Sequence, residues 1–277
     1  EFVAQNPLDA RTPEILFQIG WSHAEEKHDD QAIAAWATLL GKFPDTEPAA
    51  HAQFLTGSIL EERKGTLAEA VEAYKKVKTH PWAAQAAQRI AVMESKTMTV
   101  VTPRAFRSGE TPVLRITSRN LERLTFTAYR LNAESYFRKK HGFENVESLD
   151  IGLVAPDAEW IEDVPGYARL KPIAFDYPLT KLETPGVYVV KATDQKTLQA
   201  TTLVVASDLD AIVKTSRDQI LVFAQDANSG KGRPNARVLV CDGDQVVLEA
   251  ATGADGVLLH DWSPRREANR RLTYLLV

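Results

Sequence analysis

The spacing of apolar positions changes once along the chain. Between Pro13 and Lys96 the apolar residues return every three or four positions among Ala, Leu, Glu, Gln and Lys, which are good helix formers. From Thr97 onward Val, Ile, Thr, Tyr and Phe gather in short runs separated by Gly, Pro, Asn and Asp, a pattern typical of strands and turns. Because the two patterns are segregated, we expect separate α and β domains and not a doubly wound α/β enzyme.

The helical part contains an internal repeat. In both copies a glycine is followed at similar distances by an alanine, an aromatic residue, an aliphatic residue and a proline. The first copy is Gly20, Ala32, Trp36, Leu39 and Pro44, and the second is Gly57, Ala70, Tyr74, Val77 and Pro81. This order fits the tetratricopeptide pattern, although the two alanines are 38 residues apart (70 − 32) and the usual period is about 34. The segment Asp45–Pro48 accounts for the longer spacing.

Close packing explains why the repeat needs these residue types. Ala32 and Ala70 would let the second helix of each pair approach the first. Trp36 and Tyr74 are expected to fill the core between neighbouring pairs rather than to contact a ligand. A third helical element, from Pro81 to Lys96, would cap the module. Such modules bind a peptide or pack against their own chain, and the sequence leaves both possibilities open.

The first part of the β region predicts an antiparallel domain interrupted by a short helix. The expected helix is Ala133–Lys140, and Asp157–Tyr167 is expected to be a long acidic loop. Thr184-Pro185-Gly186 is a β-turn signal. The expected strands are Met98–Thr102, Val113–Thr117, Leu124–Leu131, Val187–Ala192 and Leu198–Ala206.

A second set of strands follows Asp208, with turn residues every 8 to 12 positions or so, which favours a sandwich of the immunoglobulin or fibronectin type III kind. Asp242–Asp244 and Gly253–Gly256 are expected to be tight hairpin turns. The last strand still has a strand pattern at Val277, so we expect the protein to continue beyond it. The expected strands are Ala211–Thr215, Gln219–Ala224, Ala236–Cys241, Gln245–Ala250, Val257–His260 and Leu272–Val277.

Residues 98 to 277 resemble a known family. The runs Gly109–Ile116, Ser118–Leu121 and Leu124–Leu131 look like the opening strands of the first macroglobulin domain of bacterial α2-macroglobulin-like proteins, and Pro185–Val190 is similar to its closing hairpin. Val204–Leu209 is similar to the link onward. Four further segments are similar to parts of the next macroglobulin domain: Ile220–Asp226, Gly230-Lys231, Pro234–Val238 and Thr252–Val257. Large bacterial members of this family carry extra domains before the first macroglobulin domain. The resemblance is therefore compatible with a helical repeat at that place.

The resemblance does not bring reactive chemistry into this chain. Members that trap proteases have a bait segment and, in many cases, a thioester formed from Cys-Gly-Glu-Gln. Here Cys241 is followed by Asp242-Gly243-Asp244-Gln245, so Gln comes four positions after Cys and not three. We interpret Cys241 as a thiol at the end of a strand, before a hairpin turn, and assign it no catalytic role.

Other candidate sites fail on spacing. His23 and His28 are five residues apart, so on one helix they would diverge and could not share a metal ion. The acidic residues of three groups are expected to be solvated surface: Glu25-Glu26, Glu61-Glu62, and Asp157, Glu159, Glu162 and Asp163. The basic groups Arg138–His141, Arg265-Arg266 and Arg270-Arg271 are expected to be surface charge or interdomain contacts. Gly230-Lys231 lacks the rest of a phosphate loop, and no Gly-x-Ser-x-Gly elbow occurs.

Composition narrows the function classes further. The chain has 277 residues, 44% hydrophobic content and a formal net charge of −4, which argues against a nucleic-acid partner. No apolar run is long enough to span a bilayer, and residues 1–6 do not form a signal peptide, although a signal removed from the mature protein would leave the same sequence. A single cysteine excludes an intramolecular disulfide framework.

These observations predict a multidomain protein, α then β. Residues 1–97 would form the tetratricopeptide-like helical repeat, and residues 98–206 and 207–277 two antiparallel macroglobulin-like (fibronectin type III-like) β-sandwich domains. We expect no enzyme activity, and no catalytic, cofactor-binding or metal-binding residue. By resemblance, the chain would be a structural N-terminal portion of a large protease inhibitor of the cell envelope, periplasmic or secreted.

The expected partners are proteases, reached through the parent protein, other envelope proteins, and the remaining macroglobulin domains of the same chain, without nucleic acid or direct membrane insertion. The alternative hypothesis is an adaptor at the cell surface, whose helical repeat binds a partner protein or peptide and whose β-domains act as spacers.

Overall fold

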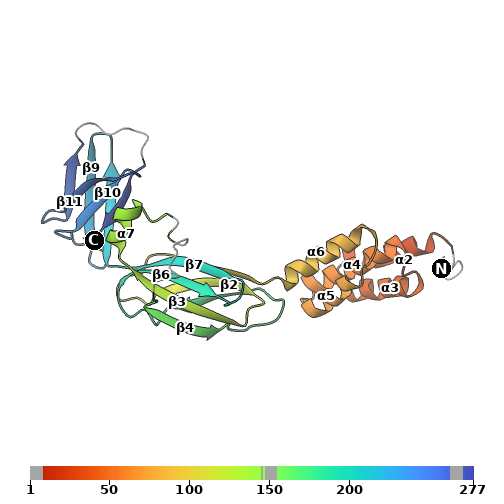
Figure 1. Cartoon of the computed structure of the whole chain (residues 1–277). Helices are drawn as coiled ribbons and strands as arrows, with labels where there is room; N and C mark the ends of the chain where they lie inside the picture. Colours follow the sequence, from red (N-terminus) through yellow and green to blue (C-terminus); the bar gives the residue numbers. More distant parts are fainter. Residues whose placement is uncertain (1–8, 145, 147–154, 263–270) are drawn as a thin grey trace. The chain divides into compact units, whose positions relative to one another are not determined.

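The computed structural model divides into two compact units (Figure 1). It describes residues 9–144, 146, 155–262 and 271–277. The first unit holds the described residues up to Lys96 together with the segment Tyr167–Pro172, and the second unit holds the remainder. The predicted class, helical repeats followed by antiparallel sheets, is confirmed. The predicted boundary between two β-domains at residue 207 stays a prediction.

The helices of the first unit begin where the sequence has helix-starting residues. Pro13, Pro48 and Pro81 lie in the first turns of their helices, where the missing N–H is not needed. Asp29 and Asp30 lie in the first turn of another, at the positive end of its dipole. The helices are α2 (Thr12–Glu25), α3 (Asp29–Lys42), α4 (Glu47–Glu62), α5 (Leu67–Lys75) and α6 (His80–Glu94).

In each predicted helix pair, the aromatic ring of the second helix lies against a glycine of the first helix. A methyl group added at Gly20 in α2 would lie 2.2 Å from Nε1 of Trp36 in α3, and one added at Gly57 in α4 would lie 2.6 Å from Cε1 of Tyr74 in α5. Trp36 and Tyr74 are almost completely buried, as expected. Each ring lies on the glycine of its own pair and also reaches the next helices, because Trp36 shares an apolar cluster with residues of α4 and Tyr74 shares one with residues of α6. The fully buried Ala32 and Ala70 complete the close approach.

The first unit also contains a short segment from the β part of the sequence. Leu170, in the connection between strands β4 and β5, is buried in one apolar cluster with Ala70, Tyr74 and Met93. Leu170 adopts the left-handed backbone region at φ 70°, which is uncommon for a residue with a side chain. No local sequence pattern predicts that Leu170 packs against the helices, so this contact was not expected.

The second unit begins with two antiparallel sheets. One sheet has the order β1-β2-β5 and the other β4-β3-β6-β7. Phe126 of β3 stacks on Tyr177 of β5 with ring centroids 4.9 Å apart, so aromatic rings join the two sheets. The strands are β1 (Thr97–Val101), β2 (Val113–Arg119), β3 (Arg123–Leu131), β4 (Ala158–Asp163), β5 (Ile173–Pro178), β6 (Gly186–Thr193) and β7 (Gln199–Ala206), with helix α7 (Ala133–Lys140) after β3.

Two strands of these sheets correct the sequence analysis. The predicted acidic loop Asp157–Tyr167 contains β4, which pairs with β3 along Ala158–Asp163. The segment Ile173–Pro178, for which no strand was predicted, forms β5 and pairs with β2. Both are edge strands, where charged residues and proline are tolerated because one side of the strand has no ladder partner. That tolerance is what made them resemble loops.

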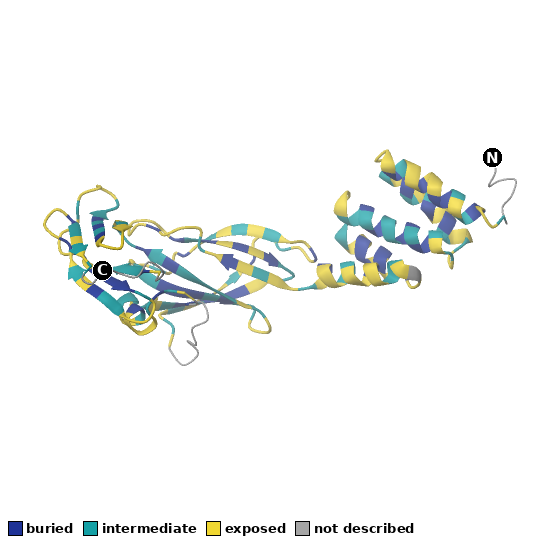
Figure 2. Cartoon of the chain, turned by 90° about the horizontal axis from the view of Figure 1, so that it is seen from above, coloured by how far each residue is buried: buried dark blue, intermediate teal, exposed yellow. Residues whose placement is uncertain are grey.

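The second unit ends with two further antiparallel sheets around one core. Their orders are β12-β9-β8 and β11-β10-β13. Ile220 and Val222 of β9 share an apolar cluster with Val238 and Val240 of β10, so the sheets face one another. Figure 2 shows buried positions interspersed with exposed ones along the strands. The strands are β8 (Leu209–Thr215), β9 (Gln219–Asp226), β10 (Arg237–Cys241), β11 (Val246–Ala251), β12 (Val257–Asp261) and β13 (Thr273–Leu276).

Candidate functional site

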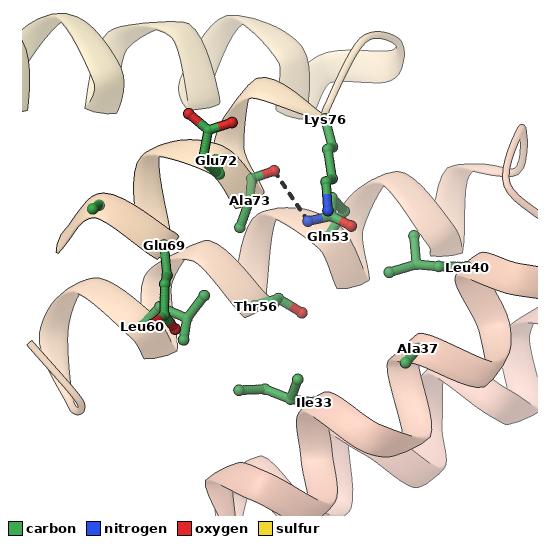
Figure 3. A pocket seen from close by; sticks show the side chains of 11 residues that line it. Ile33, Ala37, Leu40, Gln53, Thr56, Leu60, Glu69, Glu72, Ala73 and Lys76 are labelled. Carbon is green, nitrogen blue, oxygen red and sulfur yellow. Dashed lines mark hydrogen bonds between the residues drawn. The ribbon is translucent and has the colours of Figure 1, made fainter. Parts of the chain in front are cut away.

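A groove on the first unit is the main candidate for ligand binding (Figure 3). It lies across α3, α4 and α5 and has a volume of about 520 Å³. Ile33, Ala37 and Leu40 line it from α3, at the three- and four-residue spacing that places side chains on one helix face. Gln53, Thr56 and Leu60 line it from α4, and residues between Ala68 and Lys76 from the α5 side. The groove is therefore built by the repeat itself.

Polar groups in the groove are partly used by the fold. Nε2 of Gln53, a nearly buried side chain, donates to the carbonyl oxygen of Ala73 at 3.0 Å, the dashed line in Figure 3. Thr56 donates to the carbonyl oxygen of Ala52 within its own helix. The exposed Glu72 accepts from Lys75, and this hydrogen bond lowers the pKa of the Glu72 carboxyl. The groove thus offers apolar contacts with charges at its edge, which suits a peptide better than a small polar substrate.

A second polar cluster joins α4, α5 and α6. Tyr74 donates to Oε2 of Glu61 at 3.0 Å, and Nε of Arg89 donates to the same oxygen at 3.1 Å. Burial, and then the bond to Glu61, raise the pKa of the Tyr74 hydroxyl well above its usual value. Glu61 is therefore not the solvated carboxylate that the sequence predicted. All three groups are satisfied by one another, so the cluster stabilises helix packing and has no open position for a substrate.

Helix α7 packs against the second pair of sheets. Phe137 is completely buried with Leu239 and Cys241 of β10. Around this contact Arg138 pairs with Glu249 at 2.7 Å, and Arg237 pairs with Glu134 at 2.9 Å. Chiefly, the hydrogen bond to Glu249 raises the pKa of both arginines, and the hydrogen bond from Arg138 lowers the pKa of both glutamates. Arg138, predicted as surface charge or an interdomain contact, thus connects an element of the first sheet pair to the second.

Cys241 lies where the sequence predicted, at the end of β10. Its side chain is completely buried, and burial, followed by the nearby Asp242 carboxylate, raises the pKa of the thiol. The hairpin turn after it is closed by the Asp242 N–H, which donates to the carbonyl oxygen of Gln245 at 3.1 Å. A buried thiol with a raised pKa is a poor nucleophile. The assignment of no catalytic role to Cys241 stays a prediction.

The remaining acidic and basic candidates are dispersed. Glu162 accepts from Tyr177, Asp163 pairs with Arg123, and Asp157 accepts from the backbone N–H of Arg130. These residues stabilise strands and do not form a cluster. Arg265, Arg266 and Arg270 lie outside the described residues, and Arg271 approaches Glu144 at 3.5 Å. The prediction that the chain holds no catalytic or cofactor-binding residue stays a prediction.

His23 and His28 do not lie on one helix, so the prediction that their side chains diverge is wrong. Helix α2 ends at Glu25, and His28 lies immediately before α3. The two rings are 6.4 Å apart between centroids. With Glu26 they form the only group of His, Cys and carboxylate side chains, among the described parts of the chain, that could hold a metal ion. No residue type in the sequence predicts this proximity, because Glu25-Glu26-Lys27 contains no Gly, Pro or Asn to mark the end of the helix.

Comparisons with known proteins agree with this architecture. Residues 14–46 match a family model described as tetratricopeptide repeat. A crystal structure of native alpha-2-macroglobulin from Escherichia coli spanning domains MG0-NIE-MG1 is similar, with a TM-score of 0.51 and 16% sequence identity. That match covers 65% of this chain and 64% of the other.

A second crystal structure of the same E. coli protein, spanning domains NIE-MG1, matches with a TM-score of 0.49 and 16% identity and covers 65% of this chain and 97% of the other. Similarity at this identity concerns the fold. The tetratricopeptide repeat and the macroglobulin-like sheets that the sequence predicted are confirmed, and at the level of the fold so is the resemblance to bacterial α2-macroglobulin-like proteins.

Proposed function

We propose that this chain is a non-catalytic, structural N-terminal portion of a large bacterial α2-macroglobulin-like protein that inhibits proteases by trapping them. The observation that carries the proposal is the fold: the chain, with its two successive pairs of antiparallel sheets, is similar to a structure that spans domains MG0-NIE-MG1 of the E. coli protein. In a trap of this kind the domains act by holding their positions. The chain would work with proteases and other envelope proteins only through the complete protein, in the periplasm or outside the cell.

The contact of α7 supports a structural role. The completely buried Phe137, the pair of Arg138 with Glu249 and the pair of Arg237 with Glu134 tie this helix to β10 and β11. Burying an aromatic side chain stabilises by about 1.5–3 kcal/mol, whereas exposed ion pairs contribute little because water screens their charges. The apolar contact therefore dominates, with the charges fixing its orientation. In the described residues no helix is long and apolar enough to cross a membrane.

Trapping can be tested on the complete product of the gene that encodes these residues. A protease held in a cage should lose activity toward a large protein substrate but keep activity toward a short peptide, because only the peptide can diffuse in. We expect this split for the complete protein and no effect on either substrate for the 277-residue chain alone. Inhibition of both substrates by the isolated chain would contradict the proposal, since it would require an inhibitory site within these domains.

The adaptor is the second candidate function, and the groove of Figure 3 favours it. Its test is a variant that fills the groove without disturbing the core. Ala37 is exposed and lines the groove, so Ala37→Arg should abolish binding of a partner peptide. Ala34→Arg is the matched control, because Ala34 is an exposed residue of α3 that does not line the groove. The test peptide would first be selected for binding to the whole chain. If Ala37→Arg and Ala34→Arg then bound it equally well, the groove would be excluded as the binding site.

A further inference from the structure

The end of helix α2 brings two imidazoles and a carboxylate together. Lys27 adopts the left-handed backbone region at φ 60°. The His28 N–H donates to the carbonyl oxygen of His23 at 2.8 Å, and the Lys27 N–H donates to that of Ala24 at 3.1 Å. These two bonds define the Schellman motif, in which the third residue before the cap and the second residue after it come into contact. Here those residues are His23 and His28, and the cap itself is Glu26.

In Schellman motifs that contact is frequently apolar, so two histidines there are unexpected. Nδ1 of His28 lies 3.2 Å from Oε2 of Glu26. One ligand atom from each of His23, Glu26 and His28 lies within 4.8 Å of the other two. Around a tetrahedral zinc ion with bonds of about 2.0–2.2 Å, ligand atoms are roughly 3.3–3.5 Å apart. The three exposed or half-buried side chains therefore need to close by only about 1 Å, which rotation of their outer bonds can supply.

The backbone beneath the cluster is held from α4. Nη1 of Arg63 donates to the carbonyl oxygen of Ala24 at 2.9 Å and to Oδ1 of Asp29 at 2.7 Å. Lys64 pairs with Asp30 at 2.7 Å. The two neighbouring aspartates are thus already engaged by cations, and Glu26 is the carboxylate left for the cluster. The backbone that carries the three side chains is therefore held in place, and the ion would order the side chains when it binds.

We infer that His23, Glu26 and His28 bind a divalent transition-metal ion, zinc in the first instance, with water in the remaining position. Imidazole nitrogen with one carboxylate suits zinc, copper or nickel, whereas calcium and magnesium prefer oxygen ligands alone. The bound ion would link the end of α2 to the start of α3 and so stabilise the first helix pair. This site is independent of the proposed function, because it needs neither the groove nor the β-sheets.

Calorimetric titration of the metal-free 277-residue chain, without a histidine tag, with Zn²⁺ tests the site. We expect one saturable site, and an affinity lowered by more than about 10-fold in His28→Ala, because losing even an outer-shell partner of a metal usually lowers affinity by about 10- to 100-fold. Glu26→Gln should weaken binding as well. His260→Ala is the matched control: His260 contacts Trp262 and lies in the other unit, so its loss should leave the titration unchanged.

Thermal unfolding gives an independent readout. Zn²⁺ should raise the unfolding temperature of the wild-type chain and of His260→Ala, since an ion that binds only the folded state stabilises it, and Ca²⁺ should not. The His28→Ala chain should unfold at the wild-type temperature without metal, because His28 is exposed. Absence of saturable zinc binding, or equal binding by wild type and a His23→Ala, His28→Ala double variant, would overturn the inference.

Discussion

In the first helix pair Trp36 lies against Gly20, and in the second pair Tyr74 lies against Gly57. Both aromatic residues occupy the same position of the repeat, but their polar atoms have different partners. Nε1 of Trp36 donates to the carbonyl oxygen of Phe17 in its own pair at 3.1 Å. The Tyr74 hydroxyl donates to Glu61, which also accepts from Arg89 in the next helix.

The difference shows what the repeat pattern specifies. Glycine and the aromatic ring together set how closely the helices of a pair approach, and this part is common to both copies. The polar group of the ring decides which helix it is tied to: Trp36 is tied only within its pair, while Tyr74 helps to tie the second pair to the capping helix α6. The apolar part of each copy should therefore contribute more to stability than the polar part, and the polar parts should differ between copies.

The largest expected effect is the loss of the ring in the first copy. Trp36→Ala should lower the free energy of unfolding by about 3–5 kcal/mol, since it removes a completely buried aromatic side chain and leaves a cavity. Urea unfolding measures this loss. Trp21→Ala is the matched control, because Trp21 is 39% exposed and should give a clearly smaller loss. Equal losses of stability in the two variants would show that Trp36 is not part of the core of the repeat.

The glycines test the close approach in both copies. Gly20→Ala and Gly57→Ala should each destabilise by about 1–3 kcal/mol, because the new methyl group meets a buried ring. We expect the larger loss at Gly20, where the nearest ring atom would be 2.2 Å away, compared with 2.6 Å at Gly57. Thermal or urea unfolding gives the comparison.

Gly41 supplies a matched control within the same unit. It lies in α3 with no neighbouring atom within 4 Å of an added methyl group. Gly41→Ala should therefore stabilise the chain by about 0.5–1 kcal/mol, the ordinary preference of a helix for alanine. Stabilisation by Gly20→Ala of the same size would mean that Trp36 does not lie against the glycine.

The smallest effect concerns the hydroxyl of the second copy. Tyr74→Phe should lower the free energy of unfolding by about 0.5–1.5 kcal/mol, the usual contribution of one hydrogen bond. Arg89 still pairs with Glu61 in this variant, which limits the loss. Thermal unfolding near neutral pH measures it, and a loss as large as that of Trp36→Ala would contradict the order of effects given above.

The same hydroxyl should make stability depend on alkaline pH. The folded state raises the pKa of Tyr74 above its ordinary value of 10.0. The contribution of this group is therefore complete below pH 10.0 and is lost as the pH rises further, because the unfolded chain ionises first. The stability difference between wild type and Tyr74→Phe should shrink above that pH. The difference between wild type and Gly41→Ala should stay constant, and parallel behaviour of the two pairs would contradict the shift.

Sequence reasoning succeeded where one residue type has one packing role. The glycine, alanine and aromatic positions predicted the helix pairs, and alternating apolar residues in segments such as Val113–Thr117 predicted the central strands. It failed at the edge strands β4 and β5, because an edge accepts the charges and prolines that also mark loops.

It also failed where contacts depend on the fold. Leu170 is buried by helices that are distant in sequence. His23 and His28 come together because Lys27 adopts a left-handed backbone conformation, which a lysine in the sequence does not predict.

The most direct test of the central claim, that these domains belong to the frame of a larger protein, is the reading frame beyond the codon for Val277. The account predicts that it continues into further macroglobulin-like domains, with or without a Cys-Gly-Glu-Gln segment, and that segment would show which trapping chemistry applies. A stop codon directly after Val277 would contradict the account and would make the groove across α3, α4 and α5 the place to search for function.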